Sequence, residues 1–158
     1  MGLDMYLYLR KYESCSKWDK DYLEKKPNFY PEDLKEFAED INNRNFLSKQ
    51  TLYQVGYWRK ANAIHAWFVK NCADDVDECQ EIYVSFKQAK ELRNLINRVL
   101  DCHEKAEELL PTEDGFFFGN TEYNEWYYKN LEYTRDLLNK IIVKCDGGDY
   151  DIIYQASW

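Results

Sequence analysis

The sequence VGYWRKANAIHAWFVKNC, residues 55–72, holds the densest group of chemically useful side chains in this chain. An indole, a guanidinium, an amide and one of only two imidazoles lie close together at Trp58, Arg59, Asn62 and His65. We predict that the whole stretch folds as one helix. Because residues three and four apart share a helix face, Trp58, Asn62 and His65 would form one stripe, with Arg59 beside it.

These groups suit a small anionic ligand that carries an aromatic ring, such as a nucleotide derivative. Aromatic side chains would stack on the ring, an amide would hydrogen-bond its polar edge, and cations would bind phosphate. We assign phosphate to Arg59 and Lys60, and the polar edges to Asn62 and His65. The predicted ligand-binding residues are Trp58, Arg59, Lys60, Asn62, His65, Tyr123 and Tyr127.

A purely structural interpretation competes with this one. A histidine among apolar residues is more often a hydrogen-bonded core residue than a ligand contact. Asn62 could tie a neighbouring loop through its amide, and Trp58 could simply belong to the core. The two interpretations differ in whether Arg59, Asn62 and His65 converge in an open cleft or are paired inside the protein.

Motifs for catalysis and for metal binding are weak. The five cysteines and two histidines include no Cys-x-x-Cys pair, so we predict no metal site. GFFFG, residues 115–119, lacks the lysine and hydroxyl residue of a phosphate loop, and no Gly-x-Ser-x-Gly motif occurs. We therefore predict no catalytic residue and no cofactor. An enzyme, with His65 as base and Arg59 on phosphate in a phosphoesterase or transferase, is the last of three alternatives.

The elements that would position these residues indicate an α+β fold, in a single domain over residues 1–158. Alternating apolar residues predict a strand at 2–10, and short apolar runs predict others at 81–85, 115–119 and 151–158. We expect about four helices on this small sheet of up to four short strands. They comprise a three-turn helix after Pro31, then helices over residues 55–72, 85–109 and 121–143.

Particular residues support these helices. Ser85 and Gln88 have the spacing of a capping box, and Ala89, Leu92, Ile96, Val99 and His103 would form the buried stripe of the third helix. The helix after Pro31 would carry Leu34, Phe37, Ala38 and Ile41 on one apolar face. The fourth helix would begin at a cap on Asn120 or Thr121 and include Trp126 in its apolar stripe, and residues 43–54 would form a loop. We also expect both ends of the chain in one sheet, with the indole of Trp158 packed against the domain.

Composition narrows the possible partners. The net charge is −8 and the isoelectric point is about 4.9, which argues against binding nucleic acid through a basic patch. Acidic residues are dense at 74–81 and 104–114, which favours an alternative: an acidic protein-binding inhibitor. Fourteen tyrosines and five tryptophans supply contact area for a ligand, for a partner or for a homo-oligomer.

The cysteine content and the N-terminus favour the cytoplasm. Five cysteines is an odd number, and MGLDMYLYLR is too short and too polar for the apolar core of a signal peptide. No run of about 20 apolar residues is present, so we expect no contact with a membrane. The thiols are expected to be reduced.

Four segments resemble a family of small uncharacterised proteins that is common in bacteriophage genomes. They are MGLDMYLY, VGYWRKANAIHAWFV, ELLPTEDGFFFGNTEYNEWYY and the ending YQASW. The resemblance implies no particular activity, but it implies a phage accessory protein in the cytoplasm of the host cell. In that setting, the expected function is non-enzymatic binding and sequestration of a nucleotide-derived immune signal, an anti-defence role. The alternative, an acidic inhibitor, would there act on a host defence or nucleic-acid-processing protein.

Overall fold

The structure is a computed structural model that describes residues 2–40, 46–115 and 118–158. Its contacts group into two compact units, one made of Met1–Arg10 with Tyr53–Trp158 and the other of Lys11–Leu52. Each unit is described by itself below. The expectation of a single domain over the whole chain stays a prediction.

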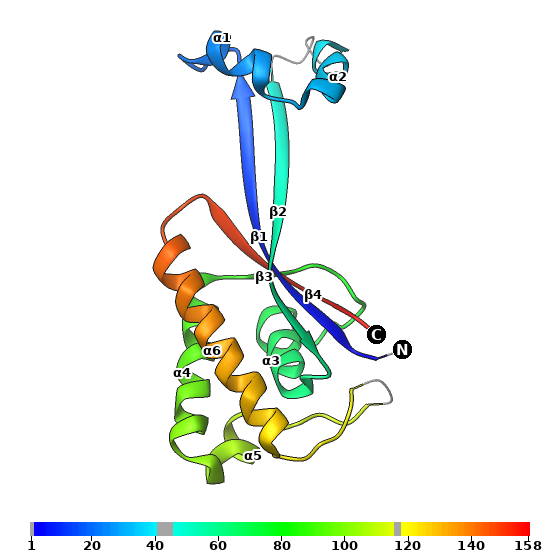
Figure 1. The fold of residues 1–158 in the computed structure, drawn as a ribbon, viewed down its shortest axis with the longest axis vertical. Coiled ribbons are helices and arrows are strands. Elements are labelled where there is room, and N and C mark those ends of the chain that lie inside the picture. The colour runs from blue at the N-terminus through cyan, green and yellow to red at the C-terminus, as the bar shows by residue number, and fades with distance from the viewer. Residues whose placement is uncertain (1, 41–45, 116–117) are drawn as a thin grey trace. The chain divides into compact units, whose positions relative to one another are not determined.

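A four-stranded sheet places the first and last strands of the chain side by side. Its order is β2-β1-β4-β3, with β1 at Asp4–Ser16, β2 at Phe46–Arg59, β3 at Ile82–Val84 and β4 at Tyr150–Ser157 (Figure 1). β3 and β4 are antiparallel, and Tyr83 pairs with Ile153. Both ends of the chain therefore lie in one sheet, as predicted. With six α-helices among the described residues, the α+β class is confirmed.

The alternation in β1 separates a helix-covered face of the sheet from an open one. Leu3, Met5 and Leu7 are fully buried in the main core, whereas Tyr6 and Tyr8 point to the other face and are partly exposed. Successive side chains of a strand point to opposite faces, so a short alternating pattern of apolar residues determines which face of the strand is buried.

The helices of the larger unit pack on the buried face of the sheet. They are α3 at Asn62–Cys72, α4 at Phe86–Asp101, α5 at Ala106–Leu109 and α6 at Glu125–Cys145. α4 and α6 run beside each other (Figure 1). Ala89, Leu92, Ile96 and Val99 of α4 are all fully buried, and the predicted capping box of Ser85 and Gln88 is present. The predicted stripe is thus confirmed over α4.

The smaller unit has little core of its own. It contains the outer parts of β1 and β2, the short helices α1 (Tyr22–Lys25) and α2 (Lys35–Asp40), and the 3-10 turns η1 (Lys26–Asn28) and η2 (Glu32–Leu34). Its buried cluster consists of Cys15, Phe29, Ala38 and Leu47. Leu34 and Phe37, expected on a buried helix face, are exposed, and Ile41 lies outside the described residues.

The prediction was wrong for the segment that leads to the candidate site. Residues 46–54 are strand and not loop, and residues 55–59 continue that strand instead of opening a helix. Gly56 and Trp58 are buried while Tyr57 and Arg59 are exposed, which is the period of two of a strand. An added Cβ at Gly56 would meet Leu137 Cδ2 at 2.5 Å and Leu7 Cβ at 3.2 Å, so glycine lets β2 pack closely against α6.

Other boundaries also differ from those predicted. The helix expected over 85–109 is interrupted at Cys102, and His103 belongs to a separate 3-10 turn, η4 (His103–Lys105). α6 begins four residues later than expected, because the side chain of Asn124 accepts hydrogen bonds from the Trp126 and Tyr127 N–H groups. Of the expected strand at 115–119, residues 116–117 lie outside the described residues, and the others are not strand.

Candidate functional site

The sharp junction between β2 and α3 shapes the region of the predicted site. Lys60 has a left-handed backbone, with φ of 57°, and its N–H donates to the Leu3 carbonyl at 2.8 Å. The chain then enters α3 through Ala61, whose carbonyl accepts from the N–H groups of Ile64 and His65 at 3.1 Å each. No side chain caps this helix start within the described residues. Unused N–H groups at a helix N-terminus favour a negative charge nearby.

Trp58 lies in the core and not in an open site. It is 2% exposed, its Nε1–H donates to Thr134 Oγ1 at 2.8 Å, and its ring meets Tyr133 edge-on at 5.7 Å. Thr134 in turn donates to the Asn130 carbonyl. The indole thus anchors β2 to α6. Because Trp58 lies on a strand while Asn62 and His65 lie on α3, the three side chains do not form one helical stripe.

Asn62 ties down the segment before α6. It is 4% exposed, and its Nδ2 donates to the carbonyls of Phe118 at 3.2 Å and Asn120 at 2.9 Å. Its Oδ1 accepts from the Glu113 N–H at 3.4 Å. All of these partners are backbone groups, so the amide ties the backbone of Glu113, Phe118 and Asn120 to α3, as the structural interpretation proposed.

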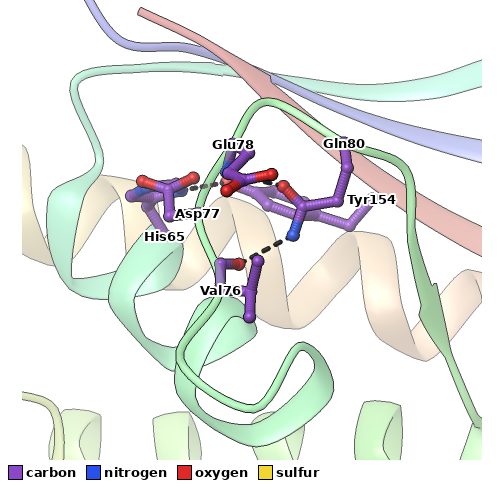
Figure 2. Close-up of polar contacts among 6 residues, drawn as sticks. All are labelled: His65, Val76, Asp77, Glu78, Gln80 and Tyr154. Atoms are coloured by element: carbon purple, nitrogen blue, oxygen red, sulfur yellow. Dashed lines mark hydrogen bonds and ion pairs between the residues drawn. The ribbon is translucent and has the colours of Figure 1, made fainter.

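His65 bridges three elements from inside the core (Figure 2). It is 1% exposed, its Nδ1 lies 2.8 Å from the Tyr154 hydroxyl of β4, and its Nε2 lies 3.1 Å from Asp77 Oδ2 in the segment before β3. A carboxylate can only accept, so Nε2 carries the proton and Nδ1 accepts from the tyrosine. Burial and the nearby Asp77 raise the pKa of Tyr154 well above its usual value, so its hydroxyl stays a donor.

The segment that carries Asp77 is held in a strained shape. Asp74, Asp75 and Cys79 all have left-handed backbones, and Gln80 bridges the turn by donating to the Val76 carbonyl at 2.7 Å (Figure 2). Its Oε1 accepts from the Glu78 N–H at 2.7 Å. Such backbone conformations persist only where surrounding contacts fix them. The contact between Asp77 and His65 is one of those contacts.

Arg59 points away from the other predicted site residues. It is exposed on the open face of the sheet and forms an ion pair with Asp4, with 3.6 Å between Nη1 and Oδ1. The predicted stripe of Trp58, Asn62 and His65 is therefore not a single surface. Asn62 and His65 are paired inside the protein, and Arg59 is paired at its surface.

A small hollow, with about 20 Å³ of free space, lies where α3 and α6 begin. Three predicted residues, Lys60, Asn62 and Tyr127, line it, together with Asn120, Asn124 and Trp126. Lys60 forms no ion pair within the described residues, and its side chain runs past Gly119, where an added Cβ would meet it at 3.1 Å. Glu122 also lines the hollow and is its one carboxylate among the residues described.

Of the two tyrosines predicted to bind the ligand, Tyr127 lines this hollow and Tyr123 does not. Tyr127 is 6% exposed, and its hydroxyl donates to the Leu110 carbonyl at 2.8 Å. Burial raises its pKa, so the hydroxyl remains protonated. Tyr123 packs edge-on against Tyr127 at 5.0 Å and accepts from the Thr112 N–H at 3.2 Å. The two rings pack against each other, and Tyr127 also contributes to the lining of the hollow.

Trp126 is the functional candidate that the sequence patterns missed. Helical spacing placed it on the buried stripe of the fourth helix, yet it is 60% exposed and lines the hollow. The available signal was Asn124, whose position before Glu125 and Trp126 is typical of a helix cap. A cap there puts Trp126 in the first turn, where a large ring is free to meet a ligand.

Comparison with protein-family models, with curated proteins and with solved structures found no match to this chain. Within residues 2–40, 46–115 and 118–158, no three His, Cys, Asp or Glu side chains gather as a metal site requires. No helix in that part of the chain is long and apolar enough to cross a membrane.

Proposed function

We propose that this chain is a non-enzymatic binding protein for a small anionic ligand that carries an aromatic ring. Its site is the hollow at the start of α3 and α6. The observation that carries the proposal is the meeting there of Lys60 with the uncapped N-terminus of α3. Both favour a negative charge, and they lie next to each other in the lining of the hollow.

The remaining lining suits the ring of such a ligand. Trp126 offers an exposed indole for stacking, and Asn120 and Asn124 offer amides that both donate and accept. The free space inside the hollow is only about 20 Å³, so a ligand would rest on its rim, with its ring against Trp126 and its phosphate near Lys60. This chemistry favours a nucleotide-derived molecule over a simple anion.

Binding is better supported than catalysis. His65, the base that a phosphoesterase would use, has both ring nitrogens engaged inside the protein. Cys72 is also unsuited to nucleophilic attack, because burial and the nearby Glu91 raise the pKa of its thiol to about 12. In the phage setting that the family resemblance implies, the protein would sequester a nucleotide immune signal in the host cytoplasm and so counter host defence.

Isothermal titration tests the proposal with mononucleotides, cyclic di- and trinucleotides and ADP-ribose derivatives. We expect at least one to bind the full chain and to be recovered intact after heat denaturation. Lys60→Asn keeps a residue that tolerates a left-handed backbone but removes the charge, and should weaken binding about tenfold or more. Lys60→Arg should retain most of the affinity.

Lys144→Asn is the matched control, since Lys144 is exposed and does not line the hollow. It should leave the affinity unchanged within about twofold. Trp126→Ala should weaken binding of ligands with a ring and spare inorganic phosphate. Absence of heat and of any thermal shift across the whole panel would rule out the proposal, and recovery of a cleaved product would favour an enzyme instead.

A further inference from the structure

A second and larger hollow, of about 420 Å³, lies between α3, α4, α5 and the segment that follows α5. We call it the acidic groove. Its floor is apolar and consists of Ala63, Ala66, Trp67, Val69, Leu95 and Leu109. Trp67, Leu95 and Leu109 are only partly buried, so part of each side chain faces the groove. Apolar surface of this kind favours a partner that brings apolar side chains of its own.

The rim of the acidic groove is negatively charged. Asp75, Glu108 and Glu113 line it and are exposed, against a single lysine, Lys70. None of these three carboxylates forms an ion pair with another described residue. They come from the two acidic stretches at 74–81 and 104–114, which lie apart in the sequence and both reach this groove.

We propose that the acidic groove binds a basic amphipathic segment of a partner protein. The apolar side chains of that segment would fill the floor, and its lysines or arginines would meet the rim carboxylates. Charge complementarity selects this occupant, because an anionic ligand or nucleic acid would be repelled by the same rim. The overall charge of −8 would speed the approach of a basic partner.

This site is separate from the one proposed for the small anionic ligand. The two hollows share Ala63 and Thr112 in their linings, but their charged groups have opposite preferences. Lys60 lies in the first hollow only, and Glu108 lies in the acidic groove only. A basic segment would therefore bind independently of Lys60, and the two proposals can fail separately.

Fluorescence anisotropy with three labelled peptides tests this inference on the full chain. Each has about 16 residues, roughly four helical turns. The first carries leucines on one helix face and lysines on the other. The second replaces the lysines by glutamates. The third has the composition of the first, with the leucines spread around the helix. We expect the first to bind most tightly, the third several-fold more weakly, and the second not at all.

Charge reversal in the protein locates the binding surface. Glu108→Lys with Glu113→Lys should weaken binding of the first peptide at least about fivefold. The matched control reverses Asp101 and Asp149, which are exposed acids outside the groove lining, and should change the affinity less than twofold or so. Lys60→Asn should have no effect on this peptide. Equal binding of the first and third peptides, or equal losses in both double variants, would overturn the inference.

A change on the groove floor completes the test. Leu95→Ser removes apolar surface that only partly contributes to the core, so the fold should be kept and the melting curve will verify it. We expect it to weaken the first peptide and to leave the salt dependence of binding intact, because the rim charges remain. Unchanged affinity in a folded Leu95→Ser variant would show that the floor takes no part, and would also contradict the inference.

Discussion

His65 is a buried imidazole whose two nitrogens each have a partner from a different element. Tyr154 is on β4 and Asp77 is in the strained segment before β3, so the ring fastens both to α3. Phe118 packs edge-on against the same ring at 5.2 Å. A buried polar group that is fully hydrogen-bonded helps to specify a unique core. Removing one of its partners leaves it unsatisfied and lowers the free energy of unfolding.

We predict that His65 acts mainly through stability. Tyr154→Phe deletes one hydroxyl and leaves Nδ1 without its donor, so the free energy of unfolding should fall by about 1–2 kcal/mol. His65→Ala also opens a cavity and should cost about 3 kcal/mol. Urea unfolding of both single variants and the double variant measures the coupling, which we expect to be about 1 kcal/mol.

Val143→Ala serves as the control for this cycle. Val143 is 85% exposed on α6, so its truncation should stay within about 0.5 kcal/mol of the parent. Additive losses in the double variant would show that the imidazole and the hydroxyl do not stabilise each other. In that case the contact between them would add nothing to the fold.

The residues around the site could be predicted from the sequence only in part. Residue types identified Asn62 and His65 as candidates. The structural interpretation, in which both side chains are hydrogen-bonded inside the protein, agrees with the partners that they have. Their geometry could not be derived, because a helical period was assumed where Trp58 belongs to a strand. Trp126 was missed because an aromatic at helical spacing is usually core, and only the Asn124 cap determines where the helix begins.

At the level of elements, α4 has the most explicit start signal. Ser85 Oγ accepts from the Gln88 N–H at 3.2 Å, and Gln88 Oε1 accepts from the Ser85 N–H at 2.9 Å. Gln88 also donates to the Asn71 carbonyl at 2.6 Å and so links α4 to the end of α3. A local sequence motif here determines both a helix boundary and a contact between helices.

We predict that Ser85→Ala lowers the free energy of unfolding by about 1 kcal/mol, since it removes the cap of a helix whose whole stripe is buried. Ser85→Asp is the matched variant. Its carboxylate can accept the same N–H at a helix start, so stability should stay close to that of the parent. Thermal unfolding of the two variants side by side measures the difference, and equal melting temperatures would contradict the prediction.

Elements with a local signal could be predicted, and those defined by tertiary contacts could not. The strand at 2–10 alternates clearly, the strand at 81–85 is a short apolar run, and the stripe of α4 has a helical period. In contrast, Gly56 packs against Leu137 of α6, which is distant in the sequence. No window of sequence around Gly56 contains that contact.

At the scale of the molecule, charge is unevenly divided between the two compact units. Residues 11–52 contain eight Lys or Arg and nine Asp or Glu, so they are nearly neutral. The larger unit therefore carries most of the charge of −8. Both hollows lie in that unit. An anionic ligand must approach against this field, so its association should quicken with added salt, whereas a basic segment should associate more slowly.

We predict that the end of β4 is essential for stability. Ala156 is 4% exposed, and Gln155 Nε2 donates to the Cys79 carbonyl at 3.1 Å, so deletion of Gln155–Trp158 removes buried surface and pairing from an inner strand. The melting temperature should fall by several degrees, or soluble expression should be lost. Scanning calorimetry of the purified variant measures the change.

Trp158→Ala distinguishes the contribution of the strand to stability from that of the Trp158 side chain. Trp158 is 42% exposed, so the packing expected for its indole is only partial, and the single substitution should cost much less than the deletion. Equal losses in the two variants would show that the indole, and not the strand, stabilises this end of the chain. A deletion variant with an unchanged melting curve would show that the end of β4 is dispensable.

The pairing of the first strand with the last has a kinetic consequence. During synthesis β1 leaves the ribosome early, but its neighbour β4 is complete only when Ser157 has emerged. Until then, the apolar side of β1 and the stripes of α4 and α6 lack the strand that lies between β1 and β3. Such distant contacts slow folding and prolong the exposure of unpaired strand edges. The nascent chain therefore has a long interval in which a chaperone, or the binding partner itself, can reach its unfinished core.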